Sequence, residues 1–186
     1  MRISKDSEER RNELIEAAEK LFAENGIANT AVSAIVKEVN VAQGLFYYYF
    51  KSKDDVIEAI SRKYAEEFRE ILQSNLEMRS FEQDLDMFLD NALISFAELW
   101  HKFHHPDEIR DLVQLSSMSL EEAKKAAVDA LVPILDRGLI EGKVTIADPN
   151  ILARIVVSGI CDLCGQNTYK KEDIKEVVET IIRKGD

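Results

Sequence analysis

Apolar residues recur through most of this chain with the period of an α-helix. The stripe near the C-terminus consists of residues spaced i, i+3, i+4, i+7 and i+8, namely Ile174, Val177, Val178, Ile181 and Ile182. Only 7 of the 186 residues are Gly and 3 are Pro, so few residues interrupt such stripes. We therefore expect an all-α fold, for which 46% apolar residues provide a core.

Helical segments are expected at about residues 7–25, 30–39, 42–50, 53–76, 81–105, 109–115, 120–140, 148–164 and 174–182. Thr30 is expected to cap the second of them, and Asn40 to form the tight turn that follows it. Ser52 and Asp55 resemble a capping box, and Asp148 with Pro149 resembles another helix start. Pro133 is expected to kink or split its helix.

The net charge of −11 is distributed unevenly, which bears on a nucleic-acid partner. Residues 1–55 contain 8 Lys or Arg and 10 Asp or Glu, so most of the acidic excess lies further along the chain. The run from Val39 to Lys53 contains no acidic residue and includes Lys51. We place a DNA-binding surface on this run.

The third helical segment has the residue types that reading DNA in the major groove requires. Ala42 and Gly44 are small enough for the backbone to approach base edges, and the Gln43 amide can pair with adenine. Tyr47, Tyr48 and Tyr49 point in three directions around a helix, so at least one is exposed and able to reach a phosphate. Phe46 and Phe50 are expected to be core residues.

Residues 30–55, TAVSAIVKEVNVAQGLFYYYFKSKDD, resemble the TetR family of bacterial regulators. The resemblance implies an N-terminal three-helix helix-turn-helix DNA-binding domain (residues 1–52), followed by a larger helical ligand-sensing and dimerisation domain (residues 53–186). By resemblance, the positions that touch DNA are Thr30, Ser33, Gln43, Gly44, Leu45, Tyr47, Tyr48, Tyr49 and Lys53. The chain departs from the family pattern at Asn40, Ala42 and Leu45.

An effector pocket is expected beside the helix at 81–105, which is apolar on several faces. Its candidate wall residues are Phe88, Asn91, Ala92, Ser95, Phe96, Leu99, Trp100, Leu112, Leu115 and Met118. The alternative is that the same side chains pack tightly without a ligand.

The last two helices are amphipathic and need a partner surface. They either complete their own domain or pair with a second chain in a four-helix bundle. The candidate interface residues are Ile151, Ile155, Ser158, Gly159, Val177, Val178 and Ile181.

The resulting hypothesis is a non-enzymatic, cytoplasmic repressor. It would bind a pseudo-palindromic double-stranded DNA operator as a homodimer and be released by a small apolar effector, with no cofactor, metal or membrane partner. The alternatives are a helical adaptor, or a redox or metal sensor that uses Cys161 and Cys164 or the cluster of His101, His104 and His105. A lone C-x-x-C on an apolar helix is more often a packing feature, and histidines beside a proline are more often solvated.

Overall fold

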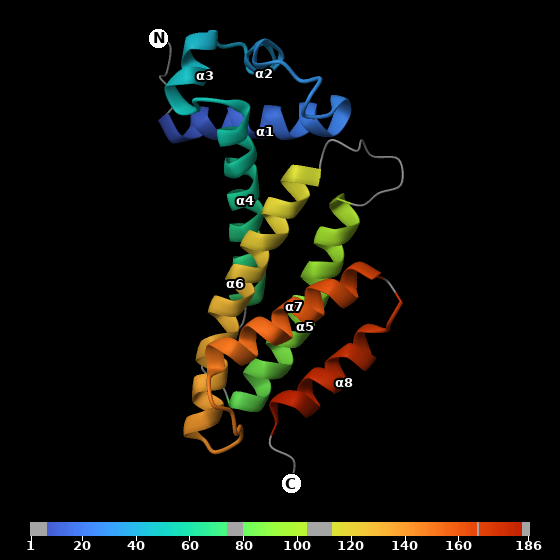
Figure 1. Cartoon of the computed structure of the whole chain (residues 1–186). Helices are drawn as coiled ribbons and strands as arrows, with labels where there is room; N and C mark the ends of the chain where they lie inside the picture. The colour runs from blue at the N-terminus through green and yellow to red at the C-terminus, as the bar shows by residue number, and fades with distance from the viewer. Residues whose placement is uncertain (1–6, 74–79, 104–112, 167, 184–186) are drawn as a thin grey trace. The chain divides into compact units, whose positions relative to one another are not determined.

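A computed structural model of the chain describes residues 7–73, 80–103, 113–166 and 168–183 (Figure 1). Every regular element within these ranges is a helix, which confirms the all-α prediction. The helices are α1 (Ser7–Asn25), α2 (Val32–Glu38), α3 (Gln43–Tyr49), α4 (Lys53–Gln73), α5 (Phe81–Phe103), α6 (Val113–Ile140), α7 (Pro149–Gln166) and α8 (Lys171–Ile182).

The described residues form two compact units. The first contains α1, α2, α3, α4 up to Lys63, and the start of α6 up to Ser119. The second contains α4 from Tyr64, then α5, α6 from Leu120, α7 and α8. The sequence predicts a boundary between a DNA-binding domain and a ligand-sensing domain at residues 52 and 53. This functional boundary stays a prediction.

The first unit is built on a small aromatic and aliphatic core, in which α2 contacts both α1 and α3. Its large side chains include Leu14, Phe22, Ile35, Phe46 and Phe50, which are at most 2% exposed. Burying a side chain of this size stabilises the fold by about 1.5–3 kcal/mol. The prediction that Phe46 and Phe50 are core residues is confirmed.

The turn between α2 and α3 is closed by two backbone hydrogen bonds. Asn40 has a φ of 54°, in the left-handed region that Asn tolerates better than most residues. Its N–H donates to the carbonyl of Lys37 over 3.1 Å, and the N–H of Val41 donates to that of Val36 over 2.9 Å. These bonds form the common C-terminal cap in which a left-handed residue ends a helix, here with Asn instead of Gly. The turn predicted at Asn40 is thus confirmed.

The predicted cap of α2 at Thr30 is wrong, because the N-cap residue is Ala31 and no side chain caps it. The Thr30 hydroxyl lies 2.7 Å from the carbonyl oxygen of Gly26 and 3.1 Å from that of Leu21, to which it donates. Thr30 is only 2% exposed. The side chain therefore satisfies carbonyls at the end of α1 instead of N–H groups of α2.

The start of α4 is capped as the sequence predicts. The Ser52 hydroxyl oxygen accepts a hydrogen bond from the N–H of Asp55 over 3.3 Å. The Asp55 carboxylate accepts from the N–H of Lys51 over 2.8 Å and from the Ser52 hydroxyl over 3.2 Å. This arrangement is a variant of the capping box, with the carboxylate bound one residue before the cap.

The Lys53 ammonium group is held by the loop between α1 and α2. Its Nζ donates to the carbonyl oxygen of Ile27 over 2.7 Å and to that of Thr30 over 3.1 Å. Hydrogen bonds with a charged donor are stronger than neutral ones. Lys53 therefore ties the first turn of α4 to the residues that precede α2.

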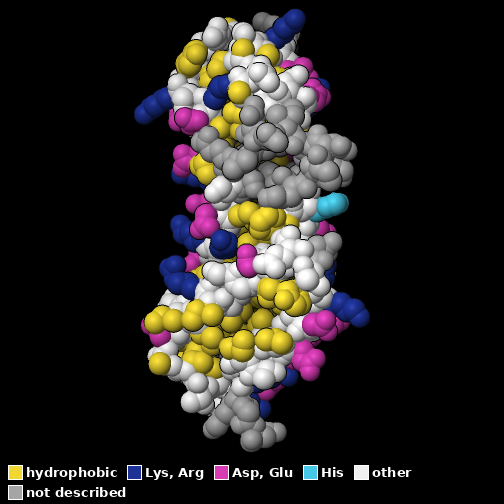
Figure 2. All heavy atoms as spheres, turned by 45° about the vertical axis from the view of Figure 1, so that its right-hand side comes forward, with side chains coloured by type: hydrophobic (Ala, Val, Ile, Leu, Met, Phe, Trp, Pro, Cys, Tyr) yellow, Lys and Arg dark blue, Asp and Glu magenta, His cyan; other side chains and the backbone are white. Residues whose placement is uncertain are grey.

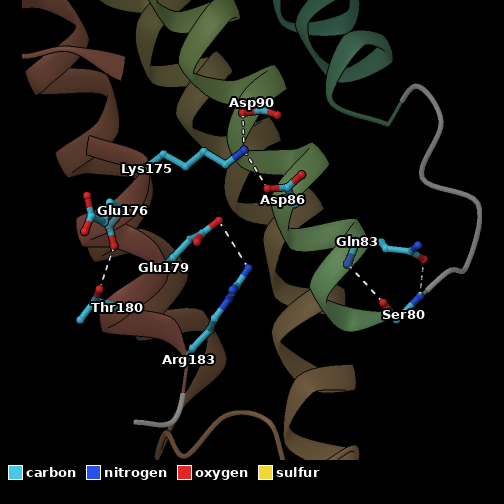
Figure 3. A network of polar contacts seen from close by, with 9 residues as sticks. All are labelled: Ser80, Gln83, Asp86, Asp90, Lys175, Glu176, Glu179, Thr180 and Arg183. Atoms are coloured by element: carbon cyan, nitrogen blue, oxygen red, sulfur yellow. Dashed lines mark hydrogen bonds and ion pairs between the residues drawn. The ribbon is translucent and has the colours of Figure 1, made fainter. Parts of the chain in front are cut away.

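In the second unit, α5 packs against α7, and α8 contacts both of them. Reciprocal hydrogen bonds between Ser80 and Gln83 cap α5 (Figure 3). The Asp148 carboxylate accepts from the N–H groups of Asn150 and Ile151 over 2.8 and 3.2 Å, which confirms the predicted start of α7.

Lys175 fastens α8 to α5, as Figure 3 shows. Its Nζ lies 2.8 Å from a carboxylate oxygen of Asp86 and 2.5 Å from one of Asp90, one helical turn apart on α5. Burial opposes the charge of Lys175, but these two hydrogen bonds outweigh it and raise the pKa of the ammonium group. The clamp links α8 to α5, and the buried face of α8 consists of Ile174, Val178 and Ile182.

Residues 113–140 form one helix, whereas the sequence predicts a short helix followed by a longer one that begins near Leu120. The serines before Leu120 lie within this helix, and the buried Ser119 hydroxyl donates to that of Ser61 over 3.3 Å. Pro133 lies within α6 and does not split it. The part of the predicted short helix before residue 113 lies outside the described residues.

We predict that Lys53→Met lowers the free energy of unfolding by about 1.5–3 kcal/mol, because it leaves two carbonyl groups without their charged donor. Lys51→Met is the matched control, since Lys51 is exposed and should change stability by less than about 0.5 kcal/mol. Urea denaturation of the two variants measures both values. Equal effects would show that the Lys53 ammonium group does not stabilise the loop.

Candidate nucleic-acid interface and associated sites

The leading end of α3 is open to an external partner. Ala42, Gln43 and Gly44 are all exposed. A Cβ atom added at Gly44 would have no atom within 4 Å, and the residue has no positive φ, so neither internal packing nor backbone strain requires glycine there. The bare backbone at Gly44 leaves room for a molecule outside the fold to approach closely.

Two of the three tyrosines predicted to contact DNA are exposed. Tyr48 is 75% exposed and Tyr47 52% exposed, so both hydroxyls are accessible to a phosphate. Tyr49 is half-buried, and its hydroxyl lies 3.1 Å from the hydroxyl of Ser7 on α1. Tyr49 therefore connects α3 to the start of α1.

The other residues predicted to contact DNA differ in their exposure and in their internal hydrogen bonds. Ser33 is exposed and Leu45 is half-buried. Thr30 is buried, and its hydroxyl donates to carbonyl oxygens. Lys53 donates to the loop between α1 and α2. The structure thus brings Ser33 and Leu45 to the outside of the unit but commits the polar groups of Thr30 and Lys53 to internal hydrogen bonds.

Lys51 is a candidate that the predicted contact set leaves out. It is exposed and directly follows Phe50, and it lies in the segment free of acidic residues that the sequence singles out. The nearby Asp55 carboxylate is occupied by the cap of α4. The absence of acidic residues around Lys51 in the sequence therefore already indicated it as a contact residue.

The residues predicted to line the effector pocket lie partly in the core of the second unit and partly along a cavity. Phe88, Ala92 and Phe96 are fully buried in the core of the second unit. Ser95 and Leu99 line a pocket of about 180 Å³ between α4 and α5. Its α4 wall, which includes Tyr64 and Phe68, is missing from the prediction because those residues belong to an apolar stripe typical of core. The prediction of the wall residues themselves stays untested.

The remaining predicted wall residues are engaged elsewhere or are not described. The Asn91 amide donates to the carbonyl oxygen of Ile71 over 3.0 Å, and the Trp100 indole N–H donates to that of Cys161 over 2.8 Å. Met118 is half-buried. Leu112 and the side chain of Leu115 lie outside the described part of the chain.

The outer face of α7 and α8 carries the most extensive exposed apolar side chains of the second unit, and Figure 2 shows hydrophobic atoms gathered there. Four of the predicted interface residues are 55–63% exposed: Ile151, Ile155, Val177 and Ile181. Ser158 and Gly159 are exposed beside them, whereas Val178 is buried. A groove of about 440 Å³ runs along this face. Exposed apolar area of this kind marks an interaction surface.

The two cysteines have the properties of packing residues. Cys161 is buried, and Cys164 is half-buried with its thiol 3.7 Å from the carbonyl oxygen of Leu93. Burial raises the pKa of the Cys161 thiol. Burial, together with the neighbouring Cys161, also raises the pKa of the Cys164 thiol to about 11. A thiol that stays protonated near neutral pH is a poor nucleophile and a poor metal ligand.

No group of three metal-ligating side chains occurs in the described ranges. His104 and His105 lie outside those ranges. No helix among the described residues is long and apolar enough to span a membrane.

Comparisons with known proteins agree with this architecture. Residues 14–60 match the sequence profile "Bacterial regulatory proteins, tetR family". The chain is 27% identical over 157 residues to the fatty acid metabolism regulator protein of Bacillus subtilis (strain 168), which covers 81% of this chain and 78% of that one. It is 28% identical over 152 residues to the HTH-type transcriptional repressor KstR2 of Mycobacterium tuberculosis, covering 76% and 72%.

The fold is also similar to that of solved structures. The structure of RolR with the ligand resorcinol superposes with a TM-score of 0.62 at 20% sequence identity, over 95% of this chain and 88% of RolR. This likeness concerns the fold, while the N-terminal match concerns the sequence of the helix-turn-helix itself. Residues 14–60 thus have the sequence of the helix-turn-helix segment of the TetR family of bacterial transcriptional regulators.

Proposed function

We propose that this regulator is a ligand-responsive repressor that binds a pseudo-palindromic operator as a homodimer. The observation that carries the proposal is the open leading end of α3, where Gln43 and Gly44 are exposed next to Tyr47 and Tyr48. Small residues and an amide at the start of a recognition helix suit the major groove. The residues up to 52 would form the reading domain, and the rest would bind the effector and the second chain.

The contact residues divide into those that read bases and those that position the helix. Gln43 would pair with a base edge, and half-buried Leu45 would contact a thymine methyl group. Tyr47, Tyr48 and Lys51 would contact phosphates, with Ser33 near them. Thr30, Tyr49 and Lys53 would act by holding α1, α2 and α3 in place, since their polar groups are bound within the unit.

The outer face of α7 and α8 is the proposed interface between two chains. Its exposed side chains are Ile151 and Ile155 on α7 and Val177 and Ile181 on α8. A four-helix bundle with two-fold symmetry requires such apolar faces on two neighbouring helices. Release from the operator would follow binding of a small effector with an apolar body in the helical part of the chain. The resorcinol complex of RolR supports a ligand site in this fold.

Selection from a randomised duplex pool at moderate salt should recover a palindrome. Gln43→Ala should then relax the base preference at one position of each half-site, at a cost of about 1–3 kcal/mol for the preferred base. Gln73→Ala is the control, because Gln73 is an exposed glutamine at the end of α4. Unchanged base preference in Gln43→Ala would overturn the proposed role of Gln43.

Gly44→Ala should separate DNA affinity from stability. Alanine fits without contacts and has the higher helix propensity, so the free energy of unfolding should rise by up to about 1 kcal/mol, whereas operator affinity should fall because the added methyl group stands at the DNA surface. Gly142→Ala is the reverse control. Its φ of 70° makes alanine destabilising by about 1 kcal/mol, with operator affinity unchanged. Undiminished operator affinity in Gly44→Ala would contradict close approach at α3.

Ile155→Glu combined with Val177→Glu should convert a dimer to monomers of 21.2 kDa, because charges would be buried in an apolar interface. Ile140→Glu is the control, since Ile140 is 86% exposed at the end of α6. Sedimentation equilibrium measures the mass. A double variant that keeps the mass of the unmodified protein would place the interface elsewhere.

A further inference from the structure

The pocket between α4 and α5 has an apolar interior. Phe68 and Tyr64 of α4 and Leu99 of α5 are 4–8% exposed and form its walls, and Ile71 lies at its edge with 42% exposure. The ring of Phe68 packs on that of Phe96, with centroids 4.7 Å apart, so this wall is held rigidly by the core. A cavity of about 180 Å³ with such walls suits the body of a small aromatic or alkyl molecule.

One polar side chain of the pocket wall lacks a hydrogen bond. Ser95 is 3% exposed, and its hydroxyl has no partner in the described part of the chain. A buried serine on a helix usually donates to the carbonyl four residues earlier, as Ser61 does to Ile57 over 3.0 Å. Leaving such a group unsatisfied is unfavourable, which points to a partner that the chain itself does not supply.

Two carboxylates stand at the rim on opposite walls. Glu67 of α4 and Glu98 of α5 are exposed, and neither makes an ion pair or hydrogen bond with a described residue. Two other carboxylates of α4 have a cationic partner, since Glu58 pairs with Arg62 and Glu66 with Arg69. None of the described residues that line the pocket is basic, so its mouth carries a negative potential.

We propose that this pocket binds a small organic cation with an apolar body, such as an aromatic amine, and that this is the effector class. The apolar body would lie against Tyr64 and Phe68, with the ammonium group between Glu67 and Glu98, and a hydrogen-bonding atom on the body would reach Ser95. A carboxylate ligand is excluded by repulsion at the rim. The effector role rests on the proposed ligand-responsive function, whereas binding to the pocket does not depend on DNA.

Three probes of nearly equal size test the class of ligand on the full chain without DNA: phenethylamine, which is a cation at neutral pH, 2-phenylethanol and phenylacetate. Calorimetric titration should give saturable binding of phenethylamine, at least tenfold weaker binding of the alcohol and none of the acid. Added salt should weaken the binding of phenethylamine only. Equal affinities, a preference for phenylacetate, or no binding of any probe would overturn the proposal.

Variants assign the binding to this pocket. E67Q combined with E98Q should weaken phenethylamine at least tenfold, whereas E70Q, an exposed carboxylate of α4 outside the pocket, should leave it unchanged. Tyramine, which adds a hydroxyl to the ring, should bind more tightly than phenethylamine, and S95A should remove that difference. Equal effects of E70Q and of the double variant would place the cation elsewhere.

Operator binding distinguishes this inference from the proposed function. If the selected duplex binds and phenethylamine releases it, both hold. If the duplex binds and a bound cation has no effect on it, the effector role is overturned. If no specific duplex is recovered while the cation still binds in the pocket, the proposed function fails and the cation site holds.

Discussion

The surface that α3 presents depends on one backbone conformation, the left-handed Asn40 between α2 and α3. The two hydrogen bonds that close this turn end α2 sharply, so that α3 begins at Gln43, three residues after Asn40. With Phe46 and Phe50 buried on one side of the segment, Gln43, Gly44 and Tyr48 are left on the other. A residue that could not adopt a positive φ would change the direction of α3 and with it the exposed set.

Internal hydrogen bonds decide which polar groups of the first unit remain available to DNA. Thr30, Lys53 and Asp55 resemble surface groups in the sequence, yet each satisfies backbone groups at a helix end or in a loop. Tyr47, Tyr48 and Lys51 have exposed side chains instead. The net charge of −11 lies mostly beyond residue 55, because residues 1–55 contain 8 Lys or Arg and 10 Asp or Glu, so the proposed surface belongs to the less acidic part of the chain.

The second unit has two apolar surfaces of different chemical character. The face of α7 and α8 is broad, and its exposed members are branched aliphatic side chains, which fits a second copy of the chain. The pocket between α4 and α5 is narrow and aromatic, with carboxylates at its mouth and a buried hydroxyl that lacks a partner. On these differences rest the two proposals, a second copy of the chain at the first surface and a small cation at the second. Val177 and Ile181 face outward because Ile174, Val178 and Ile182 form the buried face of α8.

The sequence by itself determined the helical class, the turn at Asn40, the caps at Ser52 and Asp148 and the burial of Phe46 and Phe50, because local spacing and backbone preference govern these features. Apolar spacing also predicted that α7 and α8 are amphipathic, but it left open whether they complete their own domain or pair with a second chain. Only the tertiary structure decided that Thr30 bonds to the end of α1, that Lys53 bonds to a loop 26 residues earlier and that α4 supplies a pocket wall opposite Ser95. Those outcomes depend on which distant groups meet, and a single sequence does not encode such distances in any local pattern.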